Sequence, residues 1–281
     1  MHAHDPDHAL AAVTHGSPYD YYRRLAAGPV LLFDAALGCW LASGHGVAAV
    51  LNHRDCRVRP LAQPVPPALV GSASGAIFAE LVRMNDGARH ATQKKILQQG
   101  ALGAGALQAQ LAALLQHEPA AGSLLATLRQ IDGTGELAPA NILGLLSQTC
   151  EATAGLLGNA VLALIKAGSR EAAPPAGWAA MVAEVAKHDP AIHNTRRYAA
   201  CAFDLEGAAI AEGQMILVLL ASAGMPYGHG VHLCPGQALA HTIVAATLEQ
   251  WQPALSRLAL AWRYRPSPNA RIPVFSDGGA P

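Results

Sequence analysis

The chain has 281 residues, enough to bury a sizeable core in one large domain or two small ones. Hydrophobic residues make up 52% and charged residues 14%, and 19 Lys and Arg balance 19 Asp and Glu. A net charge of zero gives no support to nucleic-acid binding, which needs a basic surface. We expect no membrane span, because no stretch offers about 20 uninterrupted apolar residues. The polar start lacks the layout of a signal peptide, and five scattered cysteines fit a reducing cytoplasm.

In chain order, the pattern predicts a mainly α protein with small β-sheets. Residues 1–16 are expected to be disordered, and residues 60–76, rich in Pro, Gly and Ala, are expected to form a loop. Apolar periodicity predicts helices over residues 18–25, 46–52, 77–98 with a break at 85–87, 105–131, 141–166, 178–188 and 237–250. Strands are predicted over residues 29–33 and 39–42, two or three times within 192–222, and as a pair within 258–275.

The most informative stretch is 227–236, which reads Tyr-Gly-His-Gly-Val-His-Leu-Cys-Pro-Gly. It places Cys234 at the end of a glycine-rich turn, ahead of an apolar run over 238–248. A thiolate held there is a metal ligand or a nucleophile, because only the deprotonated sulfur does either job well. The positive end of the following helix is expected to lower the pKa of this thiol.

Three interpretations compete for this cysteine. It could be a structural residue before a helix, or a zinc ligand with His229 and His232, although a further ligand at suitable spacing is missing. It could also be the axial ligand of a heme iron. The order aromatic-Gly-x-Gly-x-His-x-Cys-x-Gly, followed by Ala-Leu-Ala, resembles the proximal heme loop of the cytochrome P450 family. The resemblance implies heme b (iron protoporphyrin IX), with Cys234 on the iron and cofactor contacts from Tyr227, Gly228 and Gly236.

Two other segments resemble the places where this family binds the heme propionates. His90 and Lys94, one helical turn apart, stand where the family has a His and an Arg, although Lys lacks the fork that pairs with a carboxylate. Arg197 stands on a predicted strand whose Arg binds the other propionate, with Arg196 as its near competitor, and His232 is a third candidate. On local pattern alone, His90 and Lys94 would instead form an exposed basic helix face.

The predicted helix over 141–166 resembles the family's long distal helix, which crosses above the iron. Oxygen-activating members carry an acid followed directly by Thr there, and this pair delivers protons. Here Glu151 matches the acid, but Ala152 follows it and the hydroxyl moves to Thr153, about 100° further round the helix. The resemblance makes Glu151 and Thr153 the candidate catalytic residues. Alternatively, Glu151 is solvated or paired with a Lys.

Two parts of the family pattern are altered. Glu184 and Lys187 stand where the family has Glu-x-x-Arg, and the later segment that supplies their partner Arg is missing. The stretch between Lys95 and Asn141, which carries helices over the substrate pocket in the family, is shorter than usual. The resemblance therefore implies a reduced P450-like fold in a single heme domain, residues 1–281. It also implies an open distal pocket and exposed apolar surface that favours a homodimer.

The resemblance implies a heme-thiolate oxidoreductase, monooxygenase- or peroxygenase-like, that acts on a small apolar substrate. Its electrons would come from a separate ferredoxin or reductase. Because Ala152 separates Glu151 from Thr153, two alternatives remain: a non-oxygenating heme-thiolate enzyme, and a heme-binding sensor or partner subunit without turnover. A helical protein that has lost heme, with a structural Cys234, is a further alternative.

Overall fold

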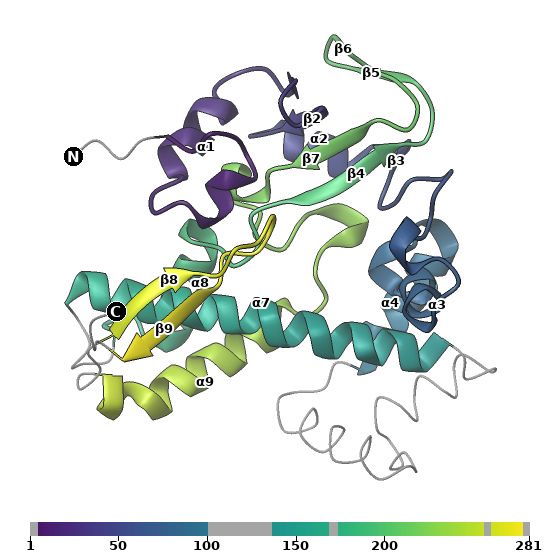
Figure 1. The fold of residues 1–281 in the computed structure, drawn as a ribbon. Coiled ribbons are helices and arrows are strands. Elements are labelled where there is room, and N and C mark those ends of the chain that lie inside the picture. Colours follow the sequence, from purple (N-terminus) through teal and green to yellow (C-terminus); the bar gives the residue numbers. More distant parts are fainter. Residues whose placement is uncertain (1–4, 101–136, 169–173, 256–259, 278–281) are drawn as a thin grey trace.

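The computed structural model describes residues 5–100, 137–168, 174–255 and 260–277. Within them the chain is mainly helical, as the sequence predicts, with small sheets (Figure 1). The helices are α1 (Tyr19–Ala26), α2 (Gly46–Asn52), α3 (Ala73–Glu80), α4 (Gly87–Gly100), α7 (Leu137–Ala167), α8 (Trp178–His188) and α9 (Gln237–Leu255). Short 3₁₀ turns are η1 (Ala11–Thr14), η2 (Pro67–Leu69), η3 (Val82–Met84), η4 (Leu220–Ala223) and η5 (Gly230–His232). The helix predicted over 105–131 lies outside the described residues.

The largest sheet in the described ranges joins strands from both halves of the chain, in the order β1-β2-β7-β4-β3. Its strands are β1 (Leu31–Asp34), β2 (Cys39–Ala42), β3 (Cys56–Arg57), β4 (Thr195–Ala199) and β7 (Met215–Val218). β2 and β7 are parallel, and the other neighbours are antiparallel. Two hairpins pair β5 (Phe203–Leu205) with β6 (Ala208–Ile210), and β8 (Leu260–Tyr264) with β9 (Pro273–Asp277). The region 192–222 thus holds four strands rather than two or three.

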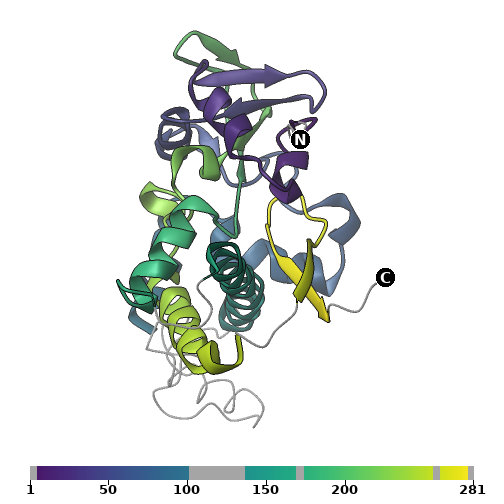
Figure 2. The same cartoon turned by 90° about the vertical axis from the view of Figure 1, so that its left-hand side faces the viewer.

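Helix α7 is the central element of the molecule. It runs below the five-stranded sheet and above α9 in Figure 1, and Figure 2 shows it end-on between α8 and α9 on one side and the β8–β9 hairpin on the other. Apolar residues three or four apart on these three helices pack into one core, as an amphipathic pattern requires. They include Leu156, Ala160, Leu164, Val182, Val185, Val244 and Leu248. Gly155 lets the chain cross α7 closely, because a Cβ there would lie 2.9 Å from the Cβ of Ala191.

The prediction of disorder for residues 1–16 is wrong for the part that the structure describes, residues 5–16. Ala9, Ala12 and Val13 are fully buried, and Ala9 and Ala12 pack in a cluster with Tyr22 and Leu41. The polar residues around these three small apolar side chains dominate the sequence pattern, but burial of the apolar ones fixes the segment against α1 and β2.

One segment of α7, Gln148–Ala167, is long and apolar enough to cross a membrane by length and composition alone, with a mean hydropathy of 1.3. The sequence analysis expects no such stretch. Half of this segment is buried inside the molecule, and the core helix of a soluble protein passes the same test. Packing against α8 and α9 therefore accounts for its apolar character.

A buried ion pair ties both ends of the described chain to its centre. Arg271, which is 1% exposed, donates from Nε to Oδ1 of Asp189 at 2.8 Å, just after the end of α8. Its Nη1 donates to the carbonyl oxygens of Val13 at 3.1 Å and His15 at 2.6 Å. Its guanidinium also lies 3.7 Å from the ring centre of Tyr264 on β8. One cation thus fixes the N-terminal segment, the end of α8 and the last hairpin.

Replacing Asp189 by Asn should lower the free energy of unfolding by about 3–5 kcal/mol, because Arg271 would stay buried without its anion. Urea unfolding followed by circular dichroism measures this. The matched control is Asp20→Asn, since Asp20 pairs with Arg23 on the exposed face of α1 and such pairs contribute about 1 kcal/mol or less. Equal, small losses in both variants would contradict the role of the buried pair.

Candidate functional site

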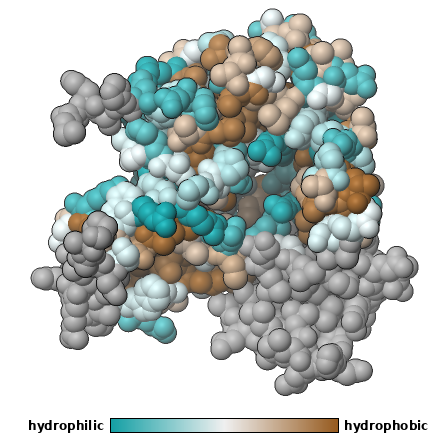
Figure 3. All heavy atoms as spheres, in the orientation of Figure 1, coloured by the Kyte–Doolittle hydropathy of each residue, from teal (hydrophilic) through white to brown (hydrophobic). Residues whose placement is uncertain are grey.

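A cavity of about 560 Å³ lies at the centre of the molecule, within the range of about 300–1,000 Å³ that is usual for ligand and cofactor sites. Figure 3 shows a hollow between the sheet-bearing part and α7, bordered by hydrophilic residues. Segments far apart in the sequence line the cavity, and most of its lining residues fall within 148–156, 191–197, 226–236 and 267–270.

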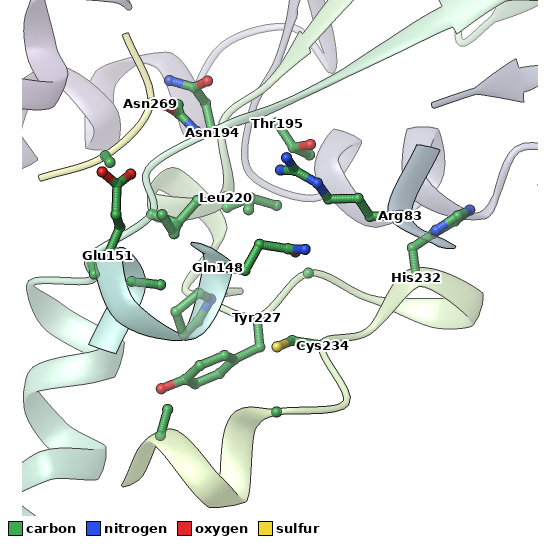
Figure 4. A pocket seen from close by; sticks show the side chains of 18 of the residues that line it. Arg83, Gln148, Glu151, Asn194, Thr195, Leu220, Tyr227, His232, Cys234 and Asn269 are labelled. Carbon is green, nitrogen blue, oxygen red and sulfur yellow. The ribbon is translucent and has the colours of Figure 1, made fainter. Parts of the chain in front are cut away.

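Cys234 stands on the wall of this cavity, and its sulfur points into it (Figure 4). The Cys234 backbone N–H donates to the carbonyl of Tyr227 at 2.9 Å, which closes the loop. Backbone N–H groups of Gly236 and Gln237 donate to the sulfur. Desolvation nevertheless raises the pKa of the Cys234 thiol, and it outweighs these two bonds and the charge of Lys94. The start of α9 lowers this pKa as expected, through the N–H groups of Gly236 and Gln237, but desolvation makes the net shift upward.

Tyr227 begins the cysteine loop, and its hydroxyl has a hydrogen-bond partner. The Tyr227 hydroxyl lies 2.6 Å from Nε2 of His241 on α9. A buried phenol usually needs such a hydrogen bond. Desolvation, followed by the nearby Cys234, raises the pKa of Tyr227 to about 12, so the phenol stays protonated near neutral pH.

Glycines set the shape of the cysteine loop. The φ angles of Gly228 (76°) and Gly230 (65°) lie in the left-handed region, which glycine adopts without strain. A Cβ at Gly230 would also lie 2.1 Å from Oδ1 of Asn52. Gly236 differs, because it lines the cavity and a Cβ there would meet only the Cys234 sulfur, at 3.9 Å. The space over Gly236 and the sulfur therefore suits a flat group seated on the sulfur.

Arg197 on β4 supplies a buried positive charge to the cavity. It is 5% exposed and lines the cavity, whereas Arg196 points to the opposite, exposed face of the strand. Its Nη1 donates to the Arg196 carbonyl at 2.8 Å, but no carboxylate of the described ranges lies within ion-pair distance. Desolvation lowers the pKa of Arg197, opposed by the charge of Asp86. A buried guanidinium without an anion is costly, so this position fits an anionic ligand group.

His232 lines the cavity beside the cysteine loop, and Asp86 and His90 lie next to its ring. Its Nε2 lies 3.0 Å from Oδ1 of Asp86, and its ring lies 4.0 Å from that of His90. His90 is buried, and desolvation followed by the charge of His232 lowers its pKa to about 4. Lys94 donates to the carbonyl of Val231. The structure therefore brings His90 and Lys94 to the back of the loop rather than into the cavity wall, and His90 is not part of an exposed helix face.

On α7, the two candidate catalytic residues occupy different environments. Thr153 is buried and lines the cavity. Glu151 also lines it, but its carboxylate is exposed at the rim and pairs with Nη2 of Arg265 at 3.0 Å. The carboxylate thus has a cationic partner, although it is an Arg rather than the Lys that the sequence suggests as an alternative.

The zinc interpretation finds no support in the described part of the chain. No group of three or more His, Cys, Asp or Glu side chains there could hold a metal ion, so His229 and His232 do not join Cys234 in such a group. Other polar residues that line the cavity were missed by the sequence analysis: Arg83, Asn194, Thr195 and Asn269. They belong to no motif, and only the folding of distant segments brings them to the cavity.

Several solved structures of known proteins have a fold similar to that of this chain. P450BioI in complex with acyl carrier protein ligated with hexadec-9Z-enoic acid matches with a TM-score of 0.75 and 17% identity, over 92% of this chain and 97% of that chain. CalO2 matches with a TM-score of 0.75 and 18% identity, over 99% and 100% of the two chains. Epothilone B-bound P450epoK matches with a TM-score of 0.75 and 16% identity, over 92% and 95%. The chain has a cytochrome P450 fold.

At such low identity the likeness shows the fold alone. No protein-family model matches the sequence, and no curated protein matches it. The P450 fold implies a heme cofactor, and the residues present fit one. A thiol faces the cavity, and among the described residues a Cβ at Gly236 would meet only the Cys234 sulfur and no carboxylate lies within ion-pair distance of the buried Arg197.

Replacing Gly230 by Ala should destabilise the protein more than replacing Gly207 by Ala. Both glycines have positive φ, but a Cβ at Gly207 would meet nothing within 4 Å, whereas one at Gly230 would overlap Asn52. Because the atom that a Cβ would meet is the end of the exposed Asn52 side chain, which can rotate away, the extra loss should be about 1 kcal/mol or less. Urea unfolding measures both losses, and the double variant Gly230→Ala/Asn52→Ala should recover the difference. Equal losses in the two single variants would refute the loop contact.

Proposed function

We propose that this chain is a single-domain heme-thiolate oxidoreductase that binds heme b through Cys234 and acts on a small apolar substrate in the cytoplasm. The observation that carries the proposal is the Cys234 thiol, which faces a cavity that is also lined by the buried Arg197, a cation with no ion-pair partner in the described ranges. When bound, the heme would supply redox chemistry with oxygen or peroxide, which a thiolate ligand favours.

The cysteine loop would position the cofactor. The Cys234 sulfur is the metal ligand, Gly228 and Gly236 leave room for a flat ring, and Tyr227 packs beside the sulfur with its hydroxyl held by His241. Bonds from two backbone N–H groups orient the sulfur. Such contacts outside the first coordination shell tune a metal site without touching the metal.

The part of the cavity lined by Arg197 and His232 would bind the heme propionates. Arg197 would pair with one carboxylate, and His232, which Asp86 holds through Nε2, would lie beside the other. His90 and Lys94 would act from behind, since the ring of His90 lies against that of His232 and Lys94 holds the loop at Val231. Two carboxylates next to an apolar ring need such partners.

On the wall of the cavity formed by α7, Glu151 and Thr153 would transfer protons. Glu151 sits at the rim, where it can exchange protons with solvent, and Thr153 lies inside the cavity. The ion pair with Arg265 favours a second candidate, a non-oxygenating heme-thiolate reaction, which needs no proton relay to dioxygen. Turnover with peroxide, or with a reductase and oxygen, supports the first candidate, and turnover that needs neither supports the second.

Partners belong to the proposal as well. A separate ferredoxin or reductase would supply electrons, and a carrier protein could deliver the substrate, as acyl carrier protein is the partner in the P450BioI complex. A homodimer is a further proposal. In the described part of the chain, the apolar side chains of Leu61, Val70 and Val231 are 64%, 68% and 67% exposed, and a partner chain would cover such side chains.

A hemin titration followed by absorption tests the proposed site. The protein should bind one equivalent of heme, and Cys234→Ala should change the absorption bands because the axial ligand is lost. Arg197→Gln should weaken heme binding by about 10–100-fold, because a propionate would lose its charged partner. Arg196→Gln, on the outer face of the same strand, is the control. Equal affinity of the two Arg variants, or unchanged bands in Cys234→Ala, would contradict the proposal.

A further inference from the structure

Arg83 is a second cation that faces the central cavity. It lies in η3, and its guanidinium reaches into the cavity (Figure 4). It makes no hydrogen bond and no ion pair with any residue that the structure describes. The residue as a whole is exposed, but desolvation at the cavity still lowers the pKa of its guanidinium.

Neighbouring cations, by contrast, have partners within the protein. Arg89 pairs with Glu80, and Arg59 donates to the side chain of Asn85 at 3.0 Å. Arg83 is exposed and keeps part of its hydration, but its guanidinium lines the cavity and its hydrogen-bond donors are available to an anionic ligand there. Arg83 therefore has the character of a binding residue rather than of a structural one.

The position of Arg83 separates it from the proposed propionate contacts. In Figure 4 its guanidinium lies across the cavity from the Cys234 sulfur, beyond Gln148 of α7 and near Thr195. A heme seated on the sulfur would occupy the space next to Cys234. The guanidinium of Arg83 would then face the side of the ring that a substrate approaches.

We propose that Arg83 binds the anionic end of the substrate, and that the substrate is an apolar monocarboxylic acid. This inference rests on the proposed function and narrows its substrate class. The planar guanidinium matches a carboxylate through two parallel hydrogen bonds. Leu156, Ile192 and Leu220 line the same cavity and provide apolar surface for the hydrocarbon part.

Calorimetric titration of the heme-loaded protein tests the inference with hexanoate, octanoate and decanoate, each compared with the alcohol and the amine of the same length. The acid should bind about 10–100-fold more tightly than the alcohol. Arg83→Gln should abolish this preference, and Arg83→Glu should reverse it in favour of the amine. Arg89→Gln, which removes an arginine paired with Glu80, should leave it unchanged.

Other outcomes would overturn the inference without touching the proposed function. One is equal binding of acid and alcohol by a protein that retains heme. Another is an Arg83→Gln variant that weakens heme binding but not carboxylate binding, since Arg83 would then serve a propionate. Failure of the chain to take up heme would refute the proposed function instead. In that case the same titrations on the heme-free full chain still decide whether Arg83 selects acids.

Discussion

The sulfur of Cys234, held at the wall of a central cavity, is the constraint on which the site depends. The backbone bond from Cys234 to Tyr227 closes its loop, and Gly230 lets that loop approach Asn52. Desolvation disfavours the charged thiolate more than two backbone N–H groups and the charge of Lys94 favour it. A coordinated metal would add a stronger positive charge at the sulfur, as its proposed ligand role requires.

The buried ion pair next to α8 does not involve Glu184 and Lys187, the two residues that the sequence resemblance singles out on this helix. Glu184 and Lys187 are exposed, and Glu184 lies 3.2 Å from His188 on the surface of α8. The buried ion pair instead joins Asp189, directly after the same helix, to Arg271 near the end of the chain. This pair fixes α8 behind the core that it shares with α7 and α9. A shortened chain can thus keep its helices in place although the usual brace is lost.

Features set by local sequence were predictable. Helices over 46–52 and 178–188 have the predicted bounds, and the cysteine loop was identified from its glycines and spacing. Features set by distant contacts were not predictable. Ala12 is buried because α1 and the sheet cover it, and Arg83 reaches the cavity only through the path of η3. The raised pKa of Cys234 likewise depends on surroundings that no short motif encodes.

The absorption spectrum of the reduced protein with carbon monoxide tests the central claim most directly, because the band position reports the ligand opposite the carbon monoxide. If Cys234 binds a heme iron as a thiolate, the Soret band should be strongly shifted to the red. A heme-loaded protein whose Soret band stays unshifted would have another axial ligand, and a protein that binds no heme would show no such band. Either result would contradict the account.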